Sequence, residues 1–171
     1  MPTATYAALV HADLDVLWSL LLDKLQSDER VLPGLDRVEI EPAEETSAPS
    51  SSGVTGKRQD RRLFFTDGRV VEERITVDEE RRNILVELRN DARYTGYVST
   101  VLFPCPMPEV TSGAHVLVRT LDWRARRSLS DDEIEEGERM AAKIKESTLG
   151  LKHEAESLRW SLDESKEPEY E

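Results

Sequence analysis

The stretch RQDRRLFFTDGRVVEERITV, residues 58–77, carries the clearest structural signal in the chain. Asp67 and Gly68 separate two runs of strand-forming residues. This dipeptide is typical of a type I′ turn, in which both central residues have positive φ. If these two residues form the loop, Arg62 lies directly opposite Glu73 in an antiparallel pair. The sequence therefore predicts a hairpin with a defined register.

Glu73 is out of place in the second strand of this hairpin. Successive side chains of a strand point to opposite faces, and the residues on the same face as Glu73 are apolar: Val71, Ile75 and Val77. With Arg62 as the predicted partner, two interpretations remain open. One is a structural ion pair that stabilises by about 0.2–1 kcal/mol. The other is a ligand-binding pair in a pocket, where burial raises the pKa of a carboxyl and a nearby arginine lowers it.

Composition limits what kind of protein this is. The chain has 171 residues, 38% of them hydrophobic, which is enough for one domain with a core, predicted over residues 1–162. A net charge of −12 argues against a nucleic-acid partner, because phosphate binding needs a basic surface. The apolar run 16–22 is too short for membrane insertion, and no secretory signal is expected. With Cys105 as the one cysteine, no intramolecular disulfide can form, and a cytoplasmic location is expected.

Alternating and helical patterns predict the remaining elements. Residues 12–28 have apolar side chains at helical spacing, with Asp13 as an N-cap. A strand is predicted to begin at Val38 and to end in a Ser/Pro-rich loop at residues 41–53. Further strands are predicted at residues 3–11, 84–88, 93–103 and 115–125.

The C-terminal part predicts one long amphipathic helix. Ser130 and Glu133 match a capping box, and an apolar stripe continues to Leu162. The last residues, 163–171, form a charged tail that is predicted to be disordered. Together these elements predict an α+β fold, in which a curved antiparallel sheet wraps around the long C-terminal helix and encloses an internal cavity.

This order of elements resembles the helix-grip, START-like superfamily (SRPBCC), and within it the little-characterised AtaL-like branch. The residues that carry the resemblance are DLDVLWSLLLDKLQSDERVLPGLDRVEI, the arginine of RRLFF, the strand GRVVEERITV and the terminal helix. The resemblance implies a deep cavity for a lipid, polyketide, isoprenoid or other apolar molecule. It also implies that some members only bind, whereas others catalyse cyclisation with a few polar cavity residues.

The candidate site residues follow from the predicted faces and from this resemblance. Glu73, Arg62 and Tyr97 are the candidate catalytic residues, because a carboxylate, a guanidinium and a phenol can move a proton or hold an oxyanion. Candidate ligand-binding residues are Phe64, Val71, Ile75, Val86, Arg119, Trp123, Met140, Ile144 and Thr148. No metal site or cofactor is expected, since the histidines are scattered and no phosphate-binding motif is present.

Three functions are consistent with these residues. The first is intracellular binding of an apolar small molecule, such as a secondary-metabolite intermediate, between the sheet and the C-terminal helix. The second is a cofactor-free cyclase or isomerase that uses Glu73 as general acid or base, with Arg62 or Tyr97 holding an oxyanion. The third is a protein-interaction module. An exposed edge strand beside the proline-rich loop would permit a homodimer.

Overall fold

The computed structural model describes residues 2–26, 34–42, 44–46, 56–105 and 113–164. Its elements, in chain order, are β1 (Thr3–Val10), α1 (Leu14–Gln26), β2 (Leu35–Ile40), β3 (Glu44–Thr46), β4 (Gly56–Phe65), β5 (Val70–Asp78), β6 (Asn83–Asn90), β7 (Tyr94–Pro104), β8 (His115–Ala125) and α2 (Asp131–Glu164). The predicted α+β class is confirmed. The differences from the prediction include the start of β2, which lies before Val38, and the strand β3, which lies within the predicted loop 41–53.

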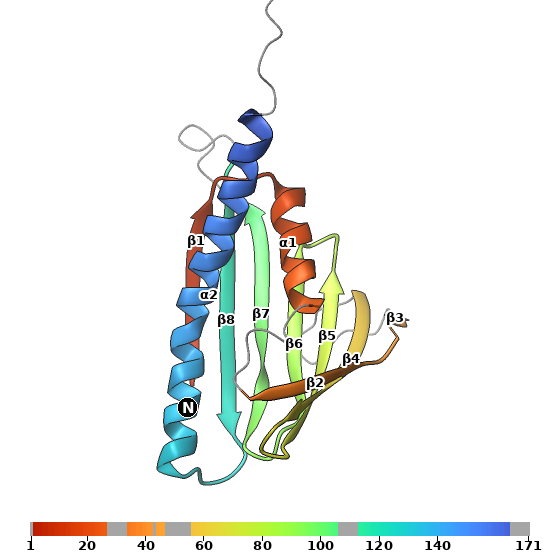
Figure 1. Ribbon diagram of the computed structural model, residues 1–171, viewed down its shortest axis with the longest axis vertical. Helices are drawn as coiled ribbons and strands as arrows, with labels where there is room; N and C mark the ends of the chain where they lie inside the picture. The colour runs from red at the N-terminus through yellow and green to blue at the C-terminus, as the bar shows by residue number, and fades with distance from the viewer. Residues whose placement is uncertain (1, 27–33, 43, 47–55, 106–112, 165–171) are drawn as a thin grey trace, which may run out of the picture.

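The described strands form one antiparallel sheet in the order β1-β8-β7-β6-β5-β4-β2, with β3 paired to β4. The sheet curves, and both helices lie on its concave side (Figure 1). The predicted architecture, a curved sheet around a long C-terminal helix, is therefore confirmed. The end of the predicted tail, 165–171, lies outside the described residues.

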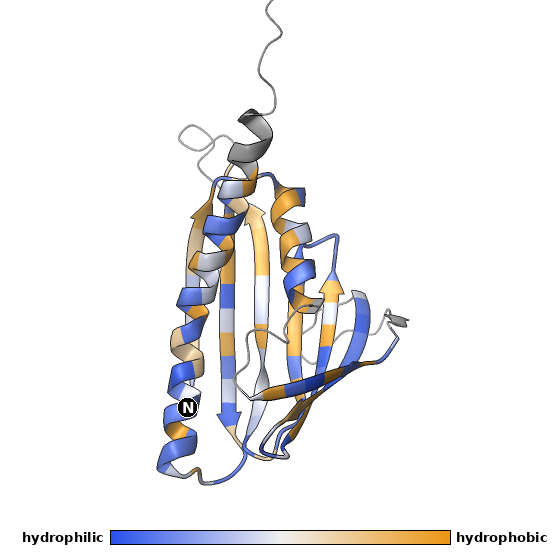
Figure 2. Ribbon diagram, in the orientation of Figure 1, coloured by the Kyte–Doolittle hydropathy of each residue, from blue (hydrophilic) through white to orange (hydrophobic). Residues whose placement is uncertain are grey.

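The helix α1 forms because its apolar positions recur with helical spacing and face the sheet. Leu17, Trp18 and Leu21 are buried, and they pack with Ile75 of β5 and Leu117 of β8 in the main hydrophobic core. Figure 2 shows α1 as largely hydrophobic, in contrast to the mostly hydrophilic α2. Burial against the sheet therefore stabilises α1.

The helix α2 begins at the predicted capping box. Glu133 accepts a hydrogen bond from the backbone N–H of Ser130 at 2.9 Å, which holds the first turn. Its buried side chains include Ile144, Leu151 and Ala155, whereas Ile134 near the N-terminus is exposed. The middle and C-terminal parts of the apolar stripe therefore make the helix–sheet contact.

The β4–β5 hairpin has a different register from the predicted one. The loop has three residues rather than two: the N–H of Gly68 donates to the carbonyl of Phe65, and the N–H of Phe65 donates to the carbonyl of Arg69. Only Gly68 has positive φ in this loop, at 83°. This is the geometry of a type I turn followed by a glycine bulge. As a result Arg61, and not Arg62, lies opposite Glu73.

Candidate functional site

A buried ion pair lies on the concave face at the middle of the β4–β5 hairpin. The Arg61 Nε atom donates to Glu73 Oε2 at 2.8 Å, and Arg61 Nη2 lies 2.7 Å from the same oxygen. Arg61 Nη1 also donates to the backbone carbonyl of Leu25 at 3.0 Å. This third bond satisfies a carbonyl in the last turn of α1, which has no partner within the helix. Arg61 thus connects two strands to the end of α1.

An apolar hollow of about 160 Å³ lies beside this pair. It is bounded by the C-terminal half of α1 and by the concave side of β4 and β5, and its lining residues are Leu22, Leu25, Ile40, Lys57, Gln59, Arg61, Ile75, Val77 and Glu79. The sequence predicted a cavity between the sheet and the C-terminal helix, α2. The apolar hollow lies instead beneath α1, and Arg61 is one of its lining residues.

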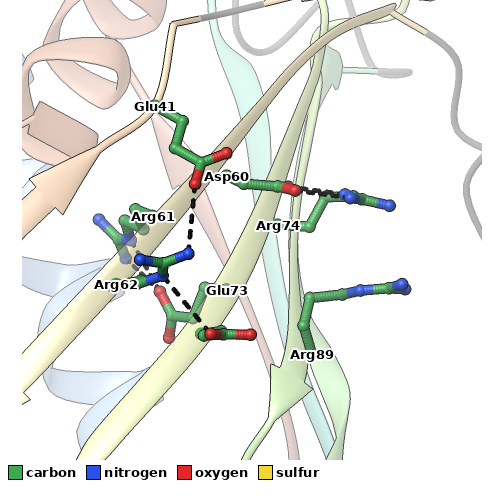
Figure 3. Close-up of a pocket in the computed structure, with 8 residues that line it drawn as sticks. Glu41, Asp60, Arg61, Arg62, Glu73, Arg74 and Arg89 are labelled. Atoms are coloured by element: carbon green, nitrogen blue, oxygen red, sulfur yellow. Dashed lines mark hydrogen bonds and ion pairs between the residues drawn. The ribbon is translucent and has the colours of Figure 1, made fainter.

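A second, polar hollow of about 290 Å³ lies around β4, β5 and β6 (Figure 3). Its lining residues are Glu41, Asp60, Arg61, Arg62, Glu72, Glu73, Arg74 and Arg89. Asp60, Arg62, Glu72 and Arg74 alternate with the concave-facing residues of the hairpin and so belong to the outer face. Arg61 therefore lines both hollows, whereas Glu73 lines the polar one.

Asp60 and Arg74 form the tightest ion pair of the polar hollow. Arg74 donates to the two carboxylate oxygens of Asp60 at 2.7 and 2.6 Å. These hydrogen bonds hold the pKa of the Asp60 carboxyl below its usual value, and they raise the pKa of Arg74. Both groups consequently remain charged at neutral pH.

Two of the three candidate catalytic residues lie on the other face from Glu73. Arg62 is exposed on the outer face, where it contacts Glu72 at 3.5 Å. Tyr97 pairs with Glu87 in the β6–β7 register, which also places it on the outer face. The predicted constellation of Glu73, Arg62 and Tyr97 is therefore not assembled, and Arg61 occupies the place expected for Arg62.

The candidate ligand-binding residues divide between the two faces. Val71, Ile75 and Val86 lie on the concave face, with the first two buried. Phe64 was wrongly placed: the corrected register puts it on the outer face, under the guanidinium of Arg37 at 3.9 Å from the ring centroid. The hairpin register alone accounts for this error.

The candidates near α2 connect the helix to the sheet. Arg119 faces the concave side and donates to Ser147 of α2 at 2.7 Å. Thr148 is buried and donates to the carbonyl of Ile144, and Met140 lies one turn nearer the N-terminus of α2, partly buried. The Arg119–Ser147 bond joins the sheet to the helix, whereas the Thr148–Ile144 bond lies within α2.

Trp123 lies on the concave face near the C-terminal end of β8. Its ring packs 5.5 Å from that of Tyr94, centroid to centroid. Its buried Nε1 atom has no hydrogen-bond partner among the described residues. Among the candidate residues near α2, Trp123 therefore has a buried N–H group without a partner in the described part of the chain.

Sequence reasoning missed the hollow beneath α1. Leu22 and Leu25 were recognised only as part of an apolar helical stripe, and Gln59 carried no signal. A correct hairpin register would have placed Arg61 and Gln59 on the concave face with Ile75.

The described part of the chain contains neither a candidate metal site nor a helix that could span a membrane. Its residues contain no group of three or more metal-ligating side chains, and His115 Nδ1 instead lies 3.0 Å from the carbonyl oxygen of Ala12. Neither α1 nor α2, as far as each is described, is long and apolar enough to cross a bilayer.

Comparison with known proteins identifies the fold. No protein-family model matches the chain, and no curated protein matches its sequence. Among solved structures, the Zhui aromatase/cyclase from a Streptomyces species is 19% identical, with a TM-score of 0.55 over 90% of this chain and 89% of its own. Protein TTHA0849 from Thermus thermophilus is 14% identical, with a TM-score of 0.57 over 92% and 99%.

A third structure, the 18 kDa protein CC1736 from Caulobacter crescentus, is 12% identical, with a TM-score of 0.57 over 92% of this chain and 98% of that protein. At such identities the similarity establishes the fold alone. Together with the sheet order and the position of α2, it shows that this chain has the helix-grip fold. The sequence resemblance predicted this fold.

Proposed function

We propose that this protein binds a small, mainly apolar molecule on the concave face of its sheet, in the hollow between α1 and strands β4 and β5. The observation that carries this proposal is the buried Arg61 in the wall of that hollow, where its ion pair with Glu73 holds it in place. Replacing a buried ion pair by apolar residues is often neutral or stabilising, so such a pair is weak evidence for a purely structural role. Its hydrogen-bonding groups could instead hold the polar end of a ligand.

The size of the hollow limits the ligand. An apolar cavity of about 150 Å³ accommodates benzene, and this hollow of about 160 Å³ is therefore suited to one ring. A larger molecule, such as a polyketide, would require α1 to move away from β4. A single-ring compound with one hydroxyl group is the simplest ligand that matches both the apolar wall and the polar pair.

Binding is better supported than catalysis. Glu73 is held by two contacts from Arg61, and an ion pair of this kind favours a charged anchor over a group that exchanges protons. The other two candidate catalytic residues lie on the outer face. One structural neighbour is named an aromatase/cyclase, which supports a small organic ligand. Membership of the AtaL-like branch and a role in secondary metabolism remain proposals from the sequence.

The proposal is tested by filling the hollow. Val77 lines it, so Val77→Phe should abolish the binding of p-cresol measured by NMR titration. Val118→Phe is the matched control, because Val118 pairs with Ala7 and Val101 on the outer face. Circular dichroism would confirm that both variants are folded. Equal binding by the two variants, or no binding by the unmodified protein, would contradict the proposal.

The role of the ion pair is tested separately. Glu73→Gln removes the charged partner that holds Arg61 in the wall of the hollow. It should weaken p-cresol binding roughly fivefold, the equivalent of one hydrogen bond of about 1 kcal/mol, and leave toluene binding unchanged. An equal loss for both compounds would show that the substitution disturbs the hollow itself.

A further inference from the structure

One half of the outer face of the sheet is apolar, and the proposed function makes no use of it. Strands β1, β7 and β8 each contain a continuous apolar run, at residues 7–10, 101–103 and 116–118. Such runs are typical of strands covered on both faces, because a strand with one wet face alternates apolar and polar residues. Figure 2 shows the three runs at the same end of the sheet, yet α1 and α2 both lie on the concave side.

The strand registers place six of these residues in two adjacent rows on the outer face. One row consists of Leu9, Val116 and Phe103, and the next consists of Ala7, Val118 and Val101. Phe103 is 41% exposed and Ala7 is exposed, whereas the other four are partly buried by their neighbours in the sheet. These six residues form what we call the outer apolar patch, and a neutral row of Thr5, Thr120 and Ser99 follows it.

Charge is distributed unevenly over this outer face. The outer apolar patch and the row beside it contain no charged residue, although 34% of the residues of the chain are charged. The other half of the outer face, on β4 and β5, presents Asp60, Arg62, Glu72 and Arg74. Charged residues are depleted at the centre of protein–protein interfaces. The patch therefore has the composition of an interface centre, and the β4–β5 half has that of a wet surface.

The shape and size of the patch select its partner. The β1–β8 and β7–β8 registers contain no bulge, and Figure 1 shows β7 and β8 as nearly straight, so the patch is flat enough to pack on an identical patch, as sheets do face to face. In such a pair neither copy buries a charge. With the neutral row, the patch measures about 14 Å by about 20 Å, from strand and residue spacings. This is well below the roughly 800 Å² per partner of a stable complex. We propose that the protein forms a reversible homodimer through this patch.

The test is sedimentation velocity of the full chain from micromolar to millimolar concentration. The expected result is a monomer that converts to a dimer as the concentration rises. Each copy has a net charge of −12, so raising NaCl from about 0.05 M to about 0.5 M should screen the repulsion and strengthen the dimer. A monomer at every concentration, or a dimer that salt weakens, would overturn the proposal.

Matched variants locate the interface. Val118→Lys places a charge at the centre of the patch and should weaken the dimer at least about tenfold. Val70→Lys is the control, because Val70 is 44% exposed on the same outer face but lies opposite Phe64, outside the patch. An equal effect of the two substitutions would overturn the assignment.

A second variant, Phe103→Ser, removes apolar area at the exposed rim of the patch and should weaken the dimer severalfold. An unchanged dimer in this variant would contradict the assignment. Circular dichroism would confirm that all three variants are folded. The dimer does not depend on the proposed function, because β8, β7, β6 and β5 separate β1 from β4 in the sheet. Binding of p-cresol beneath α1 should therefore be the same in all three variants.

Discussion

Two arginine–glutamate pairs occupy consecutive positions of the same two strands, and they differ in almost every physical respect. Arg61 and Glu73 face the concave side, with contacts of 2.7 and 2.8 Å and side chains that are 5% and 12% exposed. Arg62 and Glu72 face outward, at 3.5 Å, and are 49% and 40% exposed. The side of the sheet, and not the residue type, sets what each pair contributes.

The physical reason for this difference is desolvation. A charge removed from water is strongly destabilising unless its partner is in place, whereas an exposed charge is solvated whether or not it is paired. The inner pair should therefore be sensitive to the loss of one member. The outer pair should be nearly indifferent to the loss of one member.

The largest effect is expected for Arg61→Ala. This substitution leaves Glu73 buried without its guanidinium and also removes the donor to the Leu25 carbonyl. Loss of one member of a buried pair destabilises by about 3–5 kcal/mol. Urea unfolding followed by circular dichroism would measure it.

The control is the paired replacement Arg61→Met with Glu73→Leu, which removes both charges and fills similar volume. It should restore stability to within about 1 kcal/mol of the unmodified protein, since apolar replacement of a complete buried pair is often neutral or stabilising. If Arg61→Ala had no measurable effect, the inner pair would be equivalent to the outer one.

The sequence predicted the two strands that carry these pairs, but it paired Glu73 with the wrong arginine. Strand alternation correctly placed Glu73 on the concave face, and the order of elements correctly indicated a helix-grip fold. The loop length was wrong because Asp-Gly occurs both in two-residue turns and in three-residue turns with a glycine bulge. A shift of one residue moves every side chain of one strand to the other face, which exchanged Arg61 for Arg62 and misplaced Phe64.

Other parts of the candidate site depended on long-range geometry. The face of Tyr97 follows from its pairing with Glu87, and local sequence does not fix that pairing. The hollow beneath α1 depends on how Leu22 and Leu25 approach β5, which is set by the packing of the whole core. Periodicity indicates which helix face is apolar, but it does not show where that face leaves space.

The next largest effect is expected for Gly68→Ala, which tests the turn that sets the register. Gly68 has φ of 83°, and a Cβ atom added there would meet nothing within 4 Å, so the only penalty is the left-handed backbone, about 1–2 kcal/mol. Gly150→Ala is the matched control. Gly150 lies in α2 with equally open space, and alanine there should stabilise by about 0.5–1 kcal/mol. Changes of the same sign in urea unfolding would contradict the turn assignment.

A smaller, pH-dependent effect is expected for the Asp60–Arg74 pair on the outer face. Because hydrogen bonds from Arg74 lower the pKa of Asp60 in the folded state, the stabilisation is present above the unfolded value of about 3.9 and is lost as the pH falls below it. The Asp60 side chain is 35% exposed, so solvent screening limits the effect to about 0.5 kcal/mol. Asp60→Asn should remove this part of the acid dependence, measured by urea unfolding above and below about pH 4. If the variant had the same acid profile as the unmodified protein, the pair would make no measurable contribution to the free energy of unfolding.

The smallest effect on stability is expected for Arg62→Met, at under about 0.5 kcal/mol, because both of its contacts are long and solvent-exposed. Urea unfolding of this variant beside Arg61→Ala would measure the difference between the two pairs. A destabilisation as large as that of Arg61→Ala would mean that the side of the sheet does not set what each pair contributes.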